Sequence, residues 1–576
     1  MVMARKTSKC LDAFFIKKHA SEEISIINSE VALIYHNVKH GLSYNSLDCL
    51  AKNISKFIPD SQIAAKLTCG RTKASAITRN VLGPYSQEKV ISELKECYYF
   101  SVASYASNVG NLKTFPYAVQ YFNCNKGICR KLLDFYEEAE ETSLDIYNCL
   151  KKITTDSNLS MDQISAYSAD NASVNYGAHN SVFQKLKEEN NHIFKANCYC
   201  HVVNNCVKYA LKGLDVDIES IVIKIYNEFS SSALKTKKLK ECCEFAQIEY
   251  KELLRHVPTR WLSLLPAIDR LIRSWPAVKH YFLSKGRDNC HKVLWDFISE
   301  GCSTDFMNND DEECKKEGKN DCYLFFLSNI LPEFTKVILL LESESFTILD
   351  IDHAMRSLHD QLKSRMADNF FGSKVRDIFR KLDEEERALF KGQVHIFLQR
   401  ALKYIEERYD FSTDGIYKKF ELLSLKPQEL KLTWEVLSEL PMILNIEDAI
   451  NIDSLYSEFA CLKTVYRELP KDLPNDEIWA YFFRNNTSTN FDNLKKIVGF
   501  VLSIPTSNAF CERIFSLLNS LWTKERNRMS MDLIKSELQT RINFDVSCSE
   551  ILTVLQSSDG EKLIKMAKSS EKYFKK

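Results

Sequence analysis

The spacing of apolar residues changes along the chain and predicts segments of different structure. The first 95 residues have helical spacing and are largely polar, with a turn signal at Gly83-Pro84. Short β-prone runs follow, separated by turns rich in Asn and Gly, which is typical of antiparallel strands. They predict a meander with strands at residues 98–103, 117–122 and 128–136.

Strands and helices then alternate, which indicates a mixed α/β region around a buried sheet. The run Ile164–Ala169 is short and apolar and ends at Asp170, as expected for a buried strand. The other elements predicted here are helices at Ser143–Ile153, Ser181–Glu189, His201–Leu211 and Ile218–Phe229, and a strand at Ile193–Tyr199.

Nearly every periodic segment between residues 231 and 480 is helical, for example Tyr323–Leu341 and Glu385–Glu407. Beyond it, the short apolar run Ile497–Ile504 leads through Pro505 into C-terminal helices, one of them Met531–Ile542. We therefore expect an N-terminal helical region, the first part of an α/β core, an all-helical insertion, the completion of the core with a C-terminal helical region, and a basic tail. Their expected bounds are 1–95, 96–230, 231–480, 481–548 and 549–576.

Charge and composition limit the functions that are possible for this chain. Hydrophobic residues make up 45% of the 576 residues, enough for sizeable cores, and 77 Lys and Arg balance 77 Asp and Glu. Any contact with DNA must therefore come from a local basic surface. The 19 scattered cysteines, an odd number, favour reduced thiols in cytosol or nucleus. The N-terminal segment has no apolar stretch of signal-peptide length, and runs such as Ile497–Ile504 are too short to span a bilayer, so no membrane partner is expected.

Asp170 is the first candidate for chemistry, because α/β folds present reactive groups at the ends of strands. The alternative is that Asp170 only caps a helix that begins near Ala172. Cys198 and His201 lie at the end of the next predicted strand; a thiol and an imidazole can bind zinc, or they can be buried supports of the strand end.

Two further motifs are candidates for binding. Arg260 and Trp261 are expected to open a helix, where the indole could stack on an unpaired base or simply belong to a core. In the C-terminal segment Ile504–Ser516, Glu512 lies at a helix start, where the helix dipole alone would favour an acid. The apolar stripe that continues from it contains Phe515, Leu518 and Trp522.

Taken in order, these motifs resemble the hAT family of cut-and-paste DNA transposases. The segments that carry the resemblance are Ser-Ala-Asp-Asn-Ala-Ser-Val-Asn-Tyr-Gly at 168–177 and Ser-Asn-Ala-Phe-Cys-Glu-Arg-Ile-Phe-Ser at 507–516, which are similar to an animal hAT-like subgroup. The resemblance implies a ribonuclease H-like core, split by a large helical insertion, and a C-terminal dimerisation region. It also implies a site in which three carboxylates hold two Mg²⁺ ions.

By this resemblance, Asp170 and Glu512 match the second and third acids, and Cys198 and His201 match a supporting Cys-x-x-His pair. Arg260 and Trp261 match a pair that handles a flipped DNA base. Dimerisation is expected through the apolar residues of the C-terminal helices, namely Phe515, Leu518, Trp522, Ile534 and Leu538.

The first acid departs from the family pattern, because Tyr105 stands where relatives carry Asp. No Asp or Glu occurs between Glu96 and Asp134 that could replace it, and a neutral phenol cannot bridge two cations. We therefore expect no cofactor, with Mg²⁺ bound at Asp170 and Glu512 only if cleavage activity is retained. A BED-type zinc finger, which many relatives carry near the N-terminus, is not visible either; it was lost, or the sequence is truncated.

These observations favour a domesticated or decayed hAT transposase-like protein of the nucleus, catalytically inactive, that forms a homodimer or pairs with a related protein and retains DNA contact. The basic cluster Lys235–Lys240 is only a weak import signal, so the nuclear location follows from the resemblance. Two alternatives stay open: an active Mg²⁺-dependent transposase, and a protein-interaction scaffold that does not bind DNA.

Overall fold

The computed structural model describes residues 22–109, 112–138, 140–258, 260–300, 317–487, 490–523 and 529–574. The N-terminal segment in which no signal peptide was predicted lies outside these ranges. The chain divides into two compact units. The sheet unit contains the described residues up to Ala196 and from Thr433 onward, and the helical unit contains those from Asn197 to Leu432.

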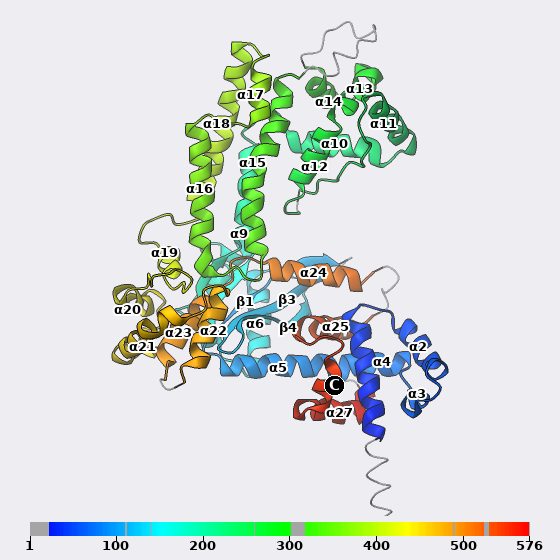
Figure 1. Cartoon of the computed structure of the whole chain (residues 1–576), viewed down its shortest axis with the longest axis vertical. Coiled ribbons are helices and arrows are strands. Elements are labelled where there is room, and N and C mark those ends of the chain that lie inside the picture. The colour runs from blue at the N-terminus through cyan, green and yellow to red at the C-terminus, as the bar shows by residue number, and fades with distance from the viewer. Residues whose placement is uncertain are drawn as a thin grey trace, which may run out of the picture. The chain divides into compact units, whose positions relative to one another are not determined.

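A mixed sheet forms the centre of the sheet unit (Figure 1). Its strand order is β2-β3-β1-β5-β6, and β4 pairs with β3. The β1–β3 and β3–β4 pairs are antiparallel, so the predicted meander is confirmed, whereas β1 and β5 are parallel. The strands are β1 (Phe100–Ala103), β2 (Ser107–Val109), β3 (Leu112–Asn123), β4 (Gly127–Glu137), β5 (Ile164–Ala169) and β6 (Phe194–Asn197).

Side chains along β3 point alternately to the two faces of the sheet, and different helices pack on each face. Tyr117, Val119 and Tyr121 are buried in one cluster with apolar side chains of α6 and α8. On the other face, Ala118 belongs to the cluster of α24 and α25, and the Gln120 amide donates to the α23 carbonyl of Leu502 over 3.1 Å. These helices are α6 (Ser143–Asp156), α8 (Val182–Glu189), α23 (Asp492–Ser503), α24 (Ala509–Leu521) and α25 (Met531–Asn543).

The remaining helices of the sheet unit come from both ends of the chain. Residues 22–39 are helical, and Tyr35 lies in one core cluster with Phe544 and Leu563. Residues 549–576, predicted to be a basic tail, contribute the helices α26 and α27 to this cluster. The other helices are α2 (Tyr44–Phe57), α3 (Gln62–Lys66), α4 (Arg71–Ile77), the π-helix η1 (Thr78–Leu82), α5 (Gly83–Glu96), α7 (Ser173–Tyr176), α20 (Trp434–Ile443), α21 (Ile452–Val465), α22 (Asn475–Asn485), α26 (Ile551–Gln556) and α27 (Ser558–Lys568).

The helical unit begins at Asn197, earlier than the predicted insertion boundary at 231, because α9 packs on α15 and α18 of this unit. Residues 433–480, which the prediction placed in the insertion, belong to the sheet unit. The helices of this unit are α9 (Tyr199–Leu211), α10 (Ile218–Ser230), α11 (Ala233–Phe245), α12 (Leu264–Arg273), α13 (Trp275–Lys285), α14 (Lys292–Ile298), α15 (Lys319–Glu342), α16 (Ile351–Ala367), α17 (Ser373–Phe379), α18 (Glu384–Glu406) and α19 (Ile416–Glu421).

Helix α15 is long and apolar enough to cross a membrane. The sequence analysis predicted this helix at Tyr323–Leu341 but did not consider it as a membrane span. Within the described residues, however, 50% of its most apolar window is buried, and it packs on α9, α12 and α16. At its start, Asp321 accepts from the Lys279 ammonium over 2.6 Å, in a buried pair. Its apolar character therefore fits a core helix of the helical unit.

Candidate functional site

Two strand ends meet at one edge of the sheet. β1 and β5 are parallel, with Ala103 opposite Ser168, and the amide of Ser104 donates to the Ser168 carbonyl over 3.0 Å. Tyr105 and Asp170 each lie two residues beyond this pair, so both leave the sheet at the same edge. By the resemblance, these are the positions expected for the first and second acids.

Helix α24 brings the third position to this edge. The Ser168 hydroxyl donates to the Asn508 side-chain oxygen over 2.7 Å, and Asn508 directly precedes α24. Glu512 is half-buried on the first turn of that helix. One turn further, the Phe515 ring meets the Tyr105 ring edge-on, with centroids 5.8 Å apart. β1, β5 and α24 thus bring Tyr105, Asp170 and Glu512 to one edge of the sheet, and their roles as acid positions stay a prediction.

Asp170 does not cap α7 itself, because the N-cap of that helix is Ala172 and no side-chain cap bond is formed there. Its Oδ1 accepts from the Asn175 amide over 2.6 Å and from the backbone N–H of Ala172 over 3.3 Å. These bonds hold the turn that leads into α7 (Ser173–Tyr176). Asp170 therefore has a structural role in the present fold, whether or not it also binds a metal.

Tyr105 is part of the apolar packing that joins α24 to the sheet. The nearest acid further along the chain, Asp134 on β4, forms an ion pair with Lys535 of α25. Within the described ranges, the one group of three His, Cys, Asp or Glu residues whose ligand atoms converge is formed by His36, His40 and Cys548, and it contains neither Asp170 nor Glu512.

The Cys-x-x-His residues lie in the helical unit, together with Trp261. Cys198 is buried at the N-terminus of α9, and its sulfur is 3.1 Å from Nδ1 of His201. The His201 ring packs edge-on against the Trp261 ring, with centroids 4.8 Å apart and an interplanar angle of 85°. The structure therefore brings two motifs that are separate in the sequence into contact, and the Trp261 indole is half-buried.

Arg260 and Trp261 lie in a turn and not at a helix start, because α12 begins only at Leu264. Leu262, with a φ of 60°, produces this delay. The Ser263 hydroxyl fixes the turn by donating to the Arg260 carbonyl over 3.0 Å. Arg260 itself is exposed, whereas His256 behind it is buried and bonded to Glu219 and Ser263. The sequence analysis did not identify this support.

Most of the residues predicted for dimerisation face the interior of their own chain. Phe515 is 5% exposed, and Leu518, Ile534 and Leu538 are fully buried between α24, α25 and the sheet. Trp522 is half-buried against the same cluster. These buried side chains contact their own chain in the described fold, and a direct role for them in dimer contacts stays a prediction.

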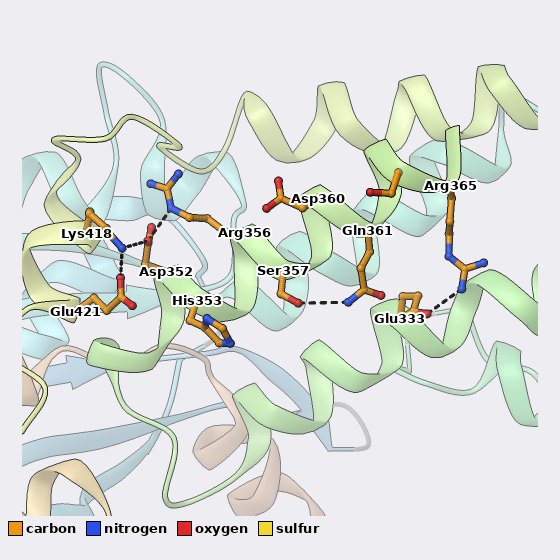
Figure 2. Close-up of a pocket in the computed structure, with 11 residues that line it drawn as sticks. Glu333, Asp352, His353, Arg356, Ser357, Asp360, Gln361, Arg365, Lys418 and Glu421 are labelled. Atoms are coloured by element: carbon orange, nitrogen blue, oxygen red, sulfur yellow. Dashed lines mark hydrogen bonds and ion pairs between the residues drawn. The ribbon is translucent and has the colours of Figure 1, made fainter. Parts of the chain in front are cut away.

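The sequence analysis also missed a polar pocket of about 500 Å³ in the helical unit, shown in Figure 2. Buried Asp352 of α16 accepts from Arg356 Nε over 2.6 Å and from the Tyr409 hydroxyl over 2.9 Å. The Asp352 carboxylate raises the pKa of Arg356, and burial raises the pKa of Tyr409. No local signal could have revealed this pocket, since its lining comes from α15, α16 and α19.

Comparison with known protein families agrees with the C-terminal motif. Residues 452–541 match the hAT family C-terminal dimerisation region. This match covers α21 to α25 almost completely and includes Glu512 and the helix that carries it. It supports membership of the chain in the hAT family and confirms that part of the resemblance.

The Ser168–Asn508 bond provides a test of how α24 is held at the sheet edge. In a double-mutant cycle of Ser168→Ala and Asn508→Ala, we expect a coupling of about 1 kcal/mol in the free energy of unfolding, measured by urea denaturation. Pairing Ser168→Ala with Ser516→Ala, on the exposed face of α24, should give a coupling near zero. Equal coupling in both cycles would contradict the contact.

Proposed function

We propose that this chain is a hAT transposase-derived nuclear protein that no longer cleaves DNA and acts as a dimer that retains DNA contact. The observation that supports the loss of cleavage is Tyr105, which stands where the resemblance expects the first acid. It lies at the same sheet edge as Asp170 and contacts α24, the helix that carries Glu512. The match over 452–541 supports the transposase-like class and self-association.

We further propose that the sheet unit is a ribonuclease H-like core. In support, an antiparallel β-meander precedes the parallel strand β5, and an acid follows that strand. In support of the split organisation, a contiguous helical unit interrupts the sheet unit between β6 and α20. The expected acids come from separate elements, as required for carboxylates that must surround two ions.

The chemistry of the edge explains why cleavage would be lost. Two Mg²⁺ ions at a phosphodiester require several carboxylate oxygens to balance their charge. Asp170 and Glu512 supply two carboxylates, and the phenol of Tyr105 supplies no charge at neutral pH. Its ring instead packs on Phe515. Tyrosine at this position therefore adds apolar contact, where an aspartate would add metal affinity.

Restoring the acid tests this proposal. The native chain should not bind Mn²⁺ at this edge or nick a DNA oligonucleotide in the presence of Mg²⁺ or Mn²⁺. Tyr105→Asp should bind Mn²⁺, measured by isothermal titration calorimetry, and nicking should then appear. Tyr105→Asn loses the same ring without adding charge and is the matched control.

Two results would contradict the proposal. Nicking by the native chain that Asp170→Asn abolishes would identify an active transposase that uses another acid. Equal Mn²⁺ binding by the Asp and Asn variants would show that the missing charge is not what prevents metal binding.

For the dimer, the exposed apolar side chains of the matched region are the ones available to a second copy. Among the large apolar residues that the structure describes between 452 and 541, Ile452 is 43% exposed and Tyr456 is 52% exposed. Both lie on α21, and Tyr456 packs edge-on against Trp434 of α20. Next to the matched region, Met442 at the end of α20 is 66% exposed.

We therefore expect the double substitution Ile452→Asp and Tyr456→Asp to convert a dimer into a folded monomer, measured by sedimentation equilibrium. Leu552→Asp, an equally exposed site outside the matched region, should leave the dimer intact. Leu518→Asp should instead reduce the free energy of unfolding by several kcal/mol, because it buries a charge. A dimer that survives both α21 substitutions would contradict this interface.

For DNA contact, exposed Arg260 beside the half-buried Trp261 has the chemistry of a phosphate contact next to a stacking ring. Arg260→Gln should weaken binding to single-stranded DNA and lower the slope of log K against log salt by about 1, measured by fluorescence anisotropy. Arg376→Gln, on the exposed face of α17, is the control for charge alone. If the native chain shows no salt-dependent binding, the scaffold alternative replaces this part of the proposal.

A further inference from the structure

A cluster in the sheet unit brings together the side chains of His36, His40 and Cys548. In the sequence, all three residues are far from Asp170. Their ligand atoms all lie within 4.8 Å of one another. The histidines come from the end of the helix at residues 22–39, and the cysteine comes from the segment after α25. Neither the family match nor the proposed function uses these residues, since the matched region ends at residue 541.

The three side chains have the spacing of a small metal site. His36 and His40 are one helical turn apart, with ring centroids separated by 4.5 Å. The Cys548 sulfur lies 3.7 Å from Nε2 of His40. Ligands around one tetrahedral Zn²⁺ are separated by about 3.4–3.6 Å, given Zn–N and Zn–S bonds of about 2.0–2.3 Å. Small rotations of exposed side chains would therefore close the site.

The backbone around the cluster is fixed on both sides. The Tyr35 hydroxyl donates to the Val546 carbonyl over 2.7 Å, and the Lys39 ammonium donates to the Phe544 carbonyl over 2.7 Å. Tyr35 and Lys39 directly precede the two histidines, and Val546 lies just before the cysteine. These bonds hold the ligands in place without help from an ion.

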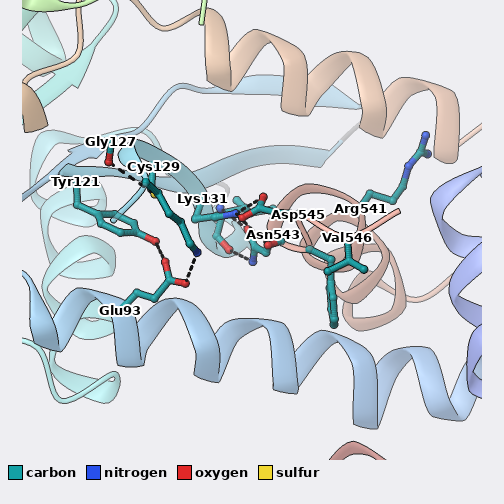
Figure 3. Close-up of polar contacts among 12 residues, drawn as sticks. Glu93, Tyr121, Gly127, Cys129, Lys131, Arg541, Asn543, Asp545 and Val546 are labelled. Atoms are coloured by element: carbon teal, nitrogen blue, oxygen red, sulfur yellow. Dashed lines mark hydrogen bonds and ion pairs between the residues drawn. The ribbon is translucent and has the colours of Figure 1, made fainter. Parts of the chain in front are cut away.

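The cysteine-bearing segment is also anchored to the sheet, as Figure 3 shows. Lys131 of β4 forms an ion pair with Asp545 at 2.5 Å. The Asn543 side chain accepts from the backbone N–H of Leu132 over 2.8 Å and donates to its carbonyl over 2.9 Å. The segment that leads to Cys548 is therefore tied to β4 by side-chain contacts.

We propose that His36, His40 and Cys548 bind one Zn²⁺ ion, with water in the fourth position. Two imidazoles and a thiolate form the soft, mixed donor set that zinc prefers over Mg²⁺. The negative end of the helix dipole at His40 also favours a cation. Both histidines are exposed, which leaves a path for the ion, and binding converts the thiol to a thiolate with release of one proton.

The test uses the full chain, stripped with a chelator and kept reduced. Titration with Co²⁺ should produce a thiolate-to-cobalt charge-transfer band, and Zn²⁺ should displace it. Cys548→Ser should abolish the band. The pair His36→Gln and His40→Gln should weaken Zn²⁺ binding at least about tenfold, because losing even a residue that only orients a ligand costs that much. Zn²⁺ should raise the Tm of the native chain but not of these variants.

Matched controls separate this site from the other cysteines and histidines. Cys49→Ser and His179→Gln change exposed residues outside the cluster and should leave the band, the affinity and the Tm increase unchanged. Circular dichroism of the unliganded variants checks that they are folded. Native-like Co²⁺ spectra and Zn²⁺ affinity in the Cys548 and histidine variants would overturn the proposal. The proposed loss of DNA cleavage would be unaffected by that result, because it depends on Tyr105.

Discussion

The contact between α24 and the end of the sheet is the constraint on which the rest of the sheet unit depends. Through Ser168, Asn508 and the Tyr105–Phe515 ring pair, a helix from the last part of the chain reaches two strands from its first third. Without this contact, Glu512 would have no relation to Asp170. Any metal site, or the lack of one, is therefore a property of tertiary packing and not of a single motif.

Local sequence patterns predicted those elements whose own residues show a clear apolar pattern. The strand at Ile164–Ala169 was predicted with its observed bounds, because it is buried along its whole length and reads as one apolar run. The short strand β2 was missed, since it pairs only with β3 and has few residues to show a pattern. Ile497–Ile504 lies mostly in α23, where burial on nearly all sides removes the helical period.

The sequence motifs named the residues of the candidate site but not their environment. The order of motifs located Asp170 and Glu512, and the parallel β1–β5 register agrees with the place assigned to Tyr105. The sequence could not show that Phe515 and Leu518 pack inward, because an apolar stripe looks the same whether it covers a sheet or a second copy. Nor could it show that His201 meets Trp261, since that contact joins separate segments.

The contact between the N-terminal helix and the segment after α25 affects when the protein can fold during synthesis. Tyr35 receives its Val546 partner 511 residues later, so the N-terminal helix must wait for almost the entire chain to be translated. At about 5–20 residues per second, this delay is roughly half a minute to two minutes, during which its apolar face lacks its final cover. The helical unit is contiguous and can fold while the ribosome is still working. Chaperone demand should therefore fall on the part of the sheet unit that is synthesised before the helical unit, the N-terminal helix included.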